Sequence, residues 1–212
     1  MRRRIIAAVC VLAGVLGTTT AATAGGSMPR PKEVKVALPA GNSNPSIANG
    51  VATGSEVALY TSSGLGPLEG NPSAPPGSPE RCTDLSLFPG GTWPAGVTVT
   101  EAQALSVLSR IRDNLAAAGL TPANVITMKA YLTRPAGASA ADYAGWNRAY
   151  RQFFANVDLK TGATIPVPMG TNAPAPPILA NKARPARATM EVAGLAVPCW
   201  LVEVEVVAAY QR

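Results

Sequence analysis

Two proline-dense segments divide this 212-residue chain and confine regular structure to the sequence around them. The first, at about residues 65–98, has prolines at positions 67, 72, 75, 76, 79, 89 and 94. The second, at about residues 157–184, has prolines at positions 166, 168, 174, 176 and 177, with Pro185 directly after it. Proline lacks an amide donor and its ring clashes with the preceding helical turn, so neither segment can hold a long helix or a central strand. We predict two ordered loops, flaps or flexible insertions within one domain.

Strand and helix patterns alternate in the remaining sequence. Thr100, with Gln103 three residues later, matches a capping box at the start of an apolar stripe with helical spacing, and Gly119 follows its end. The predicted elements are, in order, a strand at Val57–Thr61, a helix from Thr100, a strand at Val125–Thr133, a helix from Ser139, and strands at Arg187–Ala193 and Trp200–Ala209. This order predicts an α+β domain with helices packed on one face of a sheet.

The N-terminus has the composition of a secretory signal peptide. Three arginines at positions 2–4 precede the apolar run Ile5–Leu16, and a polar stretch ends in the small residues Ala22–Ala24. The apolar run is short for a membrane span, so we expect residues 1–24 to be removed after export, with an uncleaved anchor as the alternative. The expected location is periplasmic or secreted, with no membrane attachment after cleavage.

Cleavage would leave an N-terminal arm at 25–45 and a domain at 46–212. It would also remove three of the 18 basic residues and none of the 12 acidic ones, so the mature charge is ordinary. The remaining basic residues are scattered and are not interleaved with aromatic residues, which argues against nucleic-acid binding. Cys82 and Cys199 would remain in a compartment that permits disulfides, either as a pair or as two free or buried thiols.

The chain contains no histidine. This excludes Ser-His-Asp and Cys-His catalysis and the common histidine-bearing metal motifs. Aspartate and glutamate are not clustered at ligand spacing, so we expect no metal and no cofactor. Any chemistry must use arginine, lysine, carboxylates, hydroxyls, a thiol, backbone groups and water.

The two closing strands carry the most suggestive polar residues. A period of two puts Arg187, Thr189 and Glu191 on one face of their strand. We expect the alternate apolar residues, among them Met190, to face the core. Glu203 and Glu205 share one face of the last strand.

Two interpretations of this polar face stay open. One is a solvated face with a cross-strand ion pair. The other is a site in which the guanidinium of Arg187 binds a substrate carboxylate and a nearby carboxylate positions water. Ser63 and Gly64, at the end of the first strand, would add a hydroxyl and backbone N–H groups.

Three stretches resemble the RidA/YjgF family of imine and enamine deaminases, and together they span most of residues 45–210 apart from the insertions. They are Tyr60–Gly64, the run from Leu115–Leu120 to Met128–Leu132, and Pro185–Leu195 with Val202–Glu205. The resemblance implies a chorismate-mutase-like fold, with two helices on one face of a mixed sheet, assembled as a homotrimer with ligand clefts between subunits.

The resemblance also implies roles for individual residues. Arg187 would grip the carboxylate of a 2-imino or 2-enamino acid, and Glu203 would orient the attacking water. Ser63, Gly64 and Thr189 would help hold this small carboxylate ligand. Such chemistry requires neither a metal nor a cofactor.

The chain departs from the family pattern at three places. Ser46 stands where active members often have tyrosine, Thr189 stands where many have cysteine, and one extra residue lies between Leu195 and Glu203. Two alternatives to a deaminase therefore stay open. One is a non-catalytic protein that binds a small carboxylate in the same cleft, and the other is an interaction module whose proline-rich insertions form the functional surface.

Overall fold

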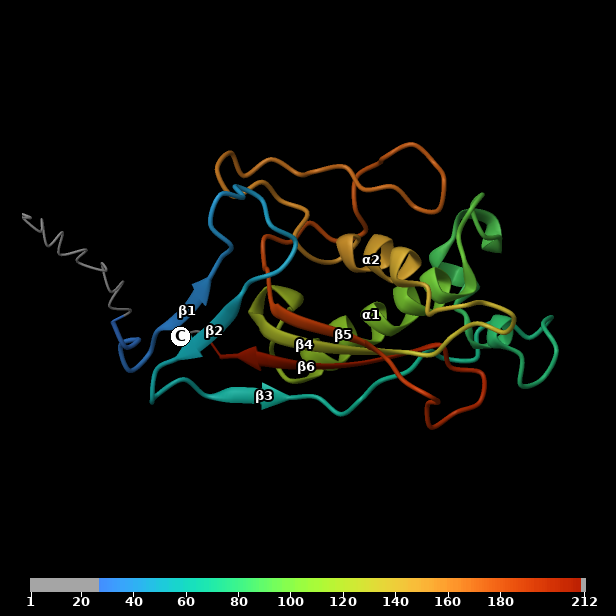
Figure 1. Ribbon diagram of the computed structural model, residues 1–212, viewed down its shortest axis with the longest axis horizontal. Coiled ribbons are helices and arrows are strands. Elements are labelled where there is room, and N and C mark those ends of the chain that lie inside the picture. Colours follow the sequence, from blue (N-terminus) through green and yellow to red (C-terminus); the bar gives the residue numbers. More distant parts are fainter. Residues whose placement is uncertain (1–26, 211–212) are drawn as a thin grey trace, which may run out of the picture.

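The computed structural model describes residues 27–210, so the expected signal peptide lies outside the described residues. Its helices and strands are β1 (Val34–Ala37), β2 (Gly50–Thr53), β3 (Leu59–Thr61), α1 (Val99–Ala117), β4 (Val125–Leu132), α2 (Tyr143–Arg151), β5 (Ala186–Glu191) and β6 (Val202–Ala209) (Figure 1). No helix within this part of the chain is long and apolar enough to span a bilayer.

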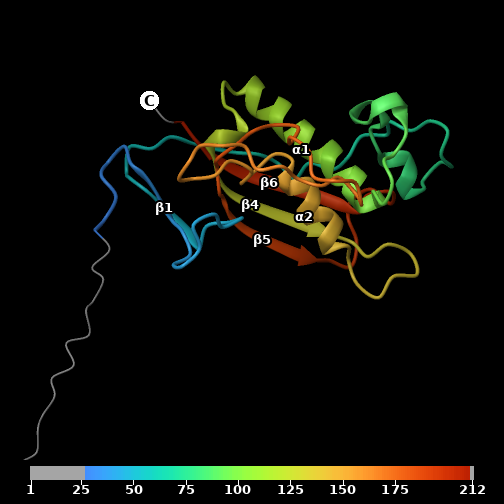
Figure 2. The ribbon, with the colours of Figure 1, turned by 90° about the horizontal axis from the view of Figure 1, so that it is seen from above.

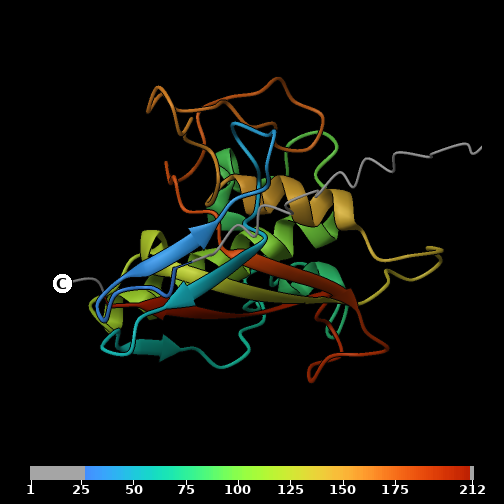
Figure 3. The ribbon, with the colours of Figure 1, turned by 60° about the vertical axis from the view of Figure 1, so that its left-hand side comes forward.

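A four-stranded sheet in the order β3-β6-β4-β5 forms the centre of the domain. β4 and β5 are parallel, whereas β6 runs antiparallel to β3 and to β4, so the sheet is mixed. Both helices lie on one face of this sheet (Figure 2). The predicted α+β class is therefore confirmed. β1 and β2 form a separate antiparallel pair beside the sheet (Figure 3), and the sequence patterns did not predict β2.

The core lies between the helices and the inward face of the sheet. Alternate residues of the two central strands point into it, and helix α1 contributes a continuous apolar stripe. These buried residues include Leu105, Leu108, Ile111, Leu115, Met128, Ala130, Leu132, Val202, Val204 and Val206. Full burial of one large apolar side chain contributes about 1.5–3 kcal/mol, so this layer fixes the sheet against α1.

The start of each helix differs from the sequence prediction. Thr98 caps α1, because its hydroxyl accepts a hydrogen bond from the Glu101 amide at 3.1 Å. The proposed cap at Thr100 is wrong by two residues. Its supposed partner Gln103 is buried instead and donates to the carbonyls of Pro79 and Cys199, both at 2.8 Å.

Helix α2 begins later than expected. Asp142, rather than Ser139, is its N-cap, and the Asp142 carboxylate accepts from the Gly145 amide at 2.8 Å. Trp146 and Tyr150 of this helix are fully buried, whereas Tyr143 is 39% exposed.

The first proline-rich segment contains three short 3-10 turns, at Pro79–Cys82, Leu85–Leu87 and Pro89–Gly91. It contains no α-helix and no strand. Cys82 of this segment forms a disulfide with Cys199, with their Cα atoms 5.9 Å apart. The bond ties the segment to the chain just before β6.

The second proline-rich segment runs past α2 (orange in Figure 1) and is anchored by the buried carboxylate of Glu101. The Glu101 carboxylate is fully buried and accepts from Arg148 Nη2 at 2.7 Å. Its other oxygen accepts from the Gly170 amide at 2.9 Å. One carboxylate therefore joins α1, α2 and the second segment.

Candidate functional site

Arg187 extends from the edge strand β5 towards α2 rather than away from it. The central carbon of its guanidinium lies 4.2 Å from the ring centroid of Tyr150 and 5.8 Å from that of Trp146. Nη2 donates to Asn147 Oδ1 at 2.7 Å. Nη1 is buried and has no hydrogen-bond partner among residues 27–210. The two aromatic rings orient the guanidinium and leave one of its edges unused.

The charge of Arg187 is not neutralised within the described part of the chain. None of the ion pairs there includes this side chain. Burial lowers the pKa of Arg187 from its ordinary value, but an arginine remains protonated at neutral pH even after a moderate shift. A partly buried guanidinium with an unused N–H is costly unless an anion binds to it. The geometry therefore makes Arg187 the candidate anion-binding residue.

Thr189 and Glu191 lie on the same strand face as Arg187, and both are engaged with the helix side. Trp146 Nε1 donates to Thr189 Oγ1 at 3.2 Å. The Glu191 carboxylate accepts from the Ala141 amide at 2.8 Å and from Arg134 Nε at 3.0 Å. Thr189 thus fixes the ring that borders the guanidinium.

The expected orientation of β5 is wrong. The polar residues face the helices, whereas Ala188 is exposed and Met190 is 37% exposed on the outer face. The physical reason is the position of β5 at the sheet edge, where α2 offers Trp146 and Tyr150 as partners for polar side chains. At a sheet edge of this kind, the residues that face the helices can be polar, and the apolar residues can face outward.

Glu203 lies on the opposite, outer face of the sheet. It is paired with Tyr131 of β4, and a Cβ placed on Gly64 would lie 2.0 Å from Glu203 Oε1. Glu205, two residues on, is held by Lys129 Nζ at 2.6 Å, whereas Glu203 has no ion pair within the described residues. Glu203 is thus the glutamate of this strand that remains available to a ligand.

The turn after β3 borders this carboxylate. Ser63 is exposed, whereas its neighbour Ser62 is buried and its hydroxyl accepts from the Val206 amide at 2.9 Å. A pocket of about 300 Å³ opens beside Gly64, with Trp200 among its lining residues. The structure therefore brings Gly64 together with Glu203 and leaves the side chain of Ser63 at the surface.

The predicted residues form two groups on opposite faces of one sheet. The arginine group consists of Arg187 and Thr189 with Asn147 and Tyr150, and the glutamate group consists of Glu203 with Ser63 and Gly64. In register, Arg187 is level with Met128, whose side chain points into the core, whereas Glu203 is level with the outward-facing Tyr131. One chain therefore does not bring Arg187 and Glu203 to a single small ligand.

Sequence reasoning missed the contributions of α2. Tyr150 donates its hydroxyl to the Ser46 carbonyl at 2.8 Å, and Arg151 Nη1 donates to Ser46 Oγ at 3.1 Å. Tyr150 belongs to the core, and its ring also supports Arg187. The pattern contained a signal for this double role, because polar residues flank Tyr150 within one helical turn.

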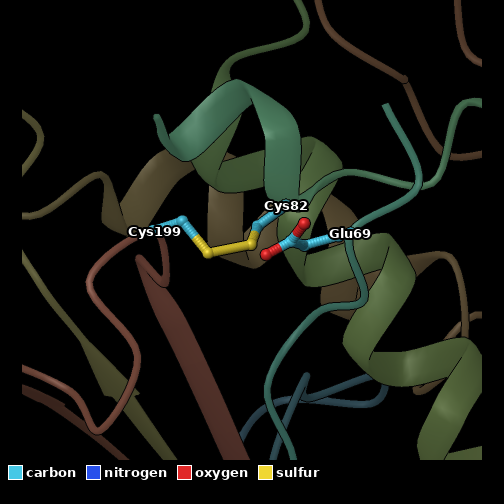
Figure 4. A group of neighbouring side chains, drawn as sticks. All are labelled: Glu69, Cys82 and Cys199. Carbon is cyan, nitrogen blue, oxygen red and sulfur yellow. A yellow bond between two sulfur atoms is a disulfide. The ribbon is translucent and has the colours of Figure 1, made fainter. Parts of the chain in front are cut away.

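Cys82, Cys199 and Glu69 lie close together (Figure 4). Because the two sulfurs are bonded to each other, they are not available as thiolate metal ligands. Glu69 accepts from Arg81 Nε at 3.0 Å. This cluster is a covalent tether with a surface ion pair beside it.

The fold and these groups define an α+β protein with two helices on one face of a mixed sheet, and with an arginine on its edge strand that forms no ion pair among the described residues. A family model described as "Endoribonuclease L-PSP" matches residues 93–210. The chain belongs to this family, the RidA/YjgF family. No curated protein matches the chain.

Several solved structures are also similar to this chain. A Rid-family protein of unknown function from Yersinia pestis is 18% identical, with a TM-score of 0.45, over 84% of this chain and 98% of its own. A protein of unknown function from Pseudomonas aeruginosa is 25% identical, with a TM-score of 0.40, over 83% of this chain and 92% of its own. E. coli TdcF, solved with bound serine, is 20% identical, with a TM-score of 0.41, over 87% of this chain and 98% of its own.

Proposed function

We propose that this protein is a hydrolytic deaminase that converts a small 2-imino or 2-enamino carboxylate into a 2-keto acid and ammonia. The observation that carries the proposal is the guanidinium of Arg187, which is partly buried, is not neutralised by a carboxylate, and keeps Nη1 without a partner among the described residues. Membership of the family adds weight, because the family includes imine and enamine deaminases.

Arg187 would bind the substrate carboxylate through charge-assisted hydrogen bonds. The imine carbon of such a substrate is already electrophilic, so water can attack it directly. The attacking water forms the new C–O bond and passes its proton to the imine nitrogen. Collapse of the resulting carbinolamine releases ammonia and leaves the keto group. A positioned carboxylate assists by orienting the water and accepting its proton in transit.

Glu203 is our candidate for that carboxylate. Since Glu203 and Arg187 lie on opposite faces of the sheet, the arginine group of one protomer would meet the glutamate group of a neighbour. We propose a homotrimer with clefts between subunits, as the family resemblance suggests. We likewise propose, from the N-terminal sequence, that the protein is exported to the periplasm or secreted.

One observation favours a second candidate function. A single chain holds the carboxylate-binding arginine but not the water-orienting glutamate on the same face, and Ser46 and Thr189 are already engaged with Arg151 and Trp146. A protein that binds a small carboxylate without turning it over is the alternative.

The test is ammonia release from 2-iminopropionate or 2-iminobutyrate, generated in situ by an amino-acid oxidase and measured above spontaneous hydrolysis. We expect the mature protein to accelerate release, and Arg187→Ala to lower kcat/KM by about tenfold to a hundredfold, the loss expected for a charged hydrogen-bonding pair. Arg112→Ala is the matched control, because the guanidinium of Arg112 lies on the surface of α1 against Asp113. No acceleration by any of these proteins, together with calorimetric binding of 2-keto acids that requires Arg187, would favour the binding protein.

A further inference from the structure

Helix α2 presents a second unsatisfied guanidinium close to the first. Arg151 follows Asn147 by four residues, so both lie on one face of the helix. Its Nη1 donates to Ser46 Oγ at 3.1 Å, while its Nε is buried and has no hydrogen-bond partner in the described chain. No ion pair within residues 27–210 includes Arg151.

The other arginines of this region are occupied. Arg148 is paired with the buried carboxylate of Glu101. Arg184 donates to the carbonyls of Pro45 at 3.0 Å and Val157 at 2.7 Å, and so serves to hold loops together. Arg151 and Arg187 are therefore the two guanidiniums here that keep a buried nitrogen without a partner.

Tyr150 and Asn147 connect the two guanidiniums. The ring of Tyr150 supports Arg187, and its hydroxyl donates to the carbonyl of Ser46, whose side chain receives Arg151. Burial raises the pKa of Tyr150 far above its ordinary value, although both arginines oppose the shift, so the phenol stays neutral and cannot offset their charge.

A pocket of about 310 Å³ lies beside this connection, between α2 and the second proline-rich segment. Its lining residues are Asn147, Arg148, Arg151, Pro166, Val167 and Pro168. Asn147 lines the pocket and also accepts the hydrogen bond from Arg187, so the pocket adjoins the arginine group directly. Because Glu101 neutralises Arg148, the net charge of the lining comes from Arg151.

We propose that the substrate is a 2-imino dicarboxylate, with its first carboxylate on Arg187 and its second on Arg151. This inference rests on the proposed function for the reaction, but the binding of the second carboxylate does not depend on turnover. A guanidinium with no ion pair among residues 27–210, next to proline and valine, matches the charge and planar geometry of one carboxylate.

Two stable five-carbon 2-keto acids test the proposal by calorimetry on the mature protein. 2-Oxoglutarate and 2-oxopentanoate differ in the terminal carboxylate that we assign to Arg151. We expect 2-oxoglutarate to bind about tenfold to a hundredfold more tightly. Arg151→Gln should reduce this preference to near one, and Arg151→Lys, which keeps the charge without the fork, should retain part of it.

Arg112→Gln removes the same charge from the surface of α1 and should leave the preference unchanged. Equal binding of the two acids, or no measurable binding of 2-oxoglutarate, would overturn the proposal. So would an Arg151→Gln variant, folded as judged by its thermal melt, that weakens both acids by the same factor. A protein that prefers 2-oxoglutarate yet releases no ammonia from any imine would contradict the deaminase proposal alone.

Discussion

Arg187 and Glu203 point to opposite faces of the same sheet, although both belong to strands that pair with β4. Arg187 stands level with Met128, which faces the core, and Glu203 stands level with Tyr131, which faces outward. A ligand that touches both side chains must lie between two protomers. Assembly is thus a requirement of the proposed reaction, and not an accessory to it.

Mixed oligomers give a direct prediction from this arrangement. Arg187→Ala and Glu203→Gln should each lose at least about tenfold in kcat/KM when expressed alone. Co-expressed at equal amounts, they should recover about a quarter of wild-type activity, because a random closed ring rebuilds that share of its intersubunit sites. Ammonia release from the purified mixture is the measurement.

The control for this experiment is a mixture of Arg187→Ala with an Arg187→Ala, Glu203→Gln double variant. That mixture contains no intact arginine group and should show only the residual activity of the Arg187→Ala protein. Activity in the first mixture no greater than in the second would show that the two residues do not share an intersubunit site.

Gly64 offers a second prediction, since its position leaves no room for a side chain beside Glu203. A Cβ at this position would lie 2.0 Å from Glu203 Oε1, and only the flexible end of that side chain would have to move. We expect Gly64→Ala to lower kcat by at least about tenfold through misplacement of the carboxylate, with a change in stability below about 1 kcal/mol.

Gly50→Ala is the matched control, because no atom lies within 4 Å of a Cβ built there. It should leave kcat unchanged. If Gly64→Ala were as active as Gly50→Ala, the exact placement of Glu203 would not matter for the reaction.

The ion pair between Glu101 and Arg148 should dominate the electrostatic contribution to stability. Its carboxylate is fully buried and also holds the Gly170 amide, so Glu101→Ala leaves the guanidinium of Arg148, whose side chain is only 25% exposed, and a buried amide without these partners. We expect a loss of about 3–5 kcal/mol in the free energy of unfolding.

Lys129→Ala provides the contrast. It breaks an ion pair with Glu205 whose lysine side chain is 57% exposed, and should cost about 0–1 kcal/mol. Urea unfolding of both variants measures the two losses in the free energy of unfolding. Similar losses for the two variants would mean that Glu101 does not anchor the second proline-rich segment.

Protonation at low pH should break the hydrogen bonds that the Glu191 carboxylate accepts from the Ala141 amide and from Arg134. The Ala141 amide, and then Arg134, hold the pKa of Glu191 below its ordinary value of 4.5. A depressed carboxyl pKa stabilises the fold above the ordinary value, and this stabilisation disappears as the pH falls through the lowered value. We therefore expect the Ala141 amide to become exchangeable only well below pH 4.5.

Hydrogen exchange and a carboxyl titration by NMR measure this release. Arg134→Gln should move the pKa of Glu191 back towards its ordinary value. An unchanged titration curve in that variant would assign the whole shift to the backbone amide.

Local sequence patterns predicted the elements well where burial is one-sided. The apolar stripe of α1 and the alternation in β4 each face one continuous core, so their period is clear. β2 was missed because its four residues pair only with β1 and bury little. The α1 cap was misplaced because two threonines stand two residues apart, and only the tertiary contacts of Gln103 show which one caps.

The candidate site was predictable to a similar degree. Arg187 was identified from a motif on one strand, but its inward orientation depends on Tyr150 and Asn147 of α2, which are distant in sequence. Glu203 alternates with the buried Val202 and Val204, so the local period of two already places it on the outer face. Only the inward orientation of Arg187 depends on a distant element.

The bond between Cys82 and Cys199 closes a covalent ring of the chain, since these residues are 117 positions apart and α1, β4, α2 and β5 all lie between them. A protease that cuts one peptide bond within this ring produces two fragments that remain covalently linked through the disulfide. Cleavage in the proline-rich segment beside α2 can therefore alter the pocket next to Arg151 without releasing either fragment, until a reductant opens the ring.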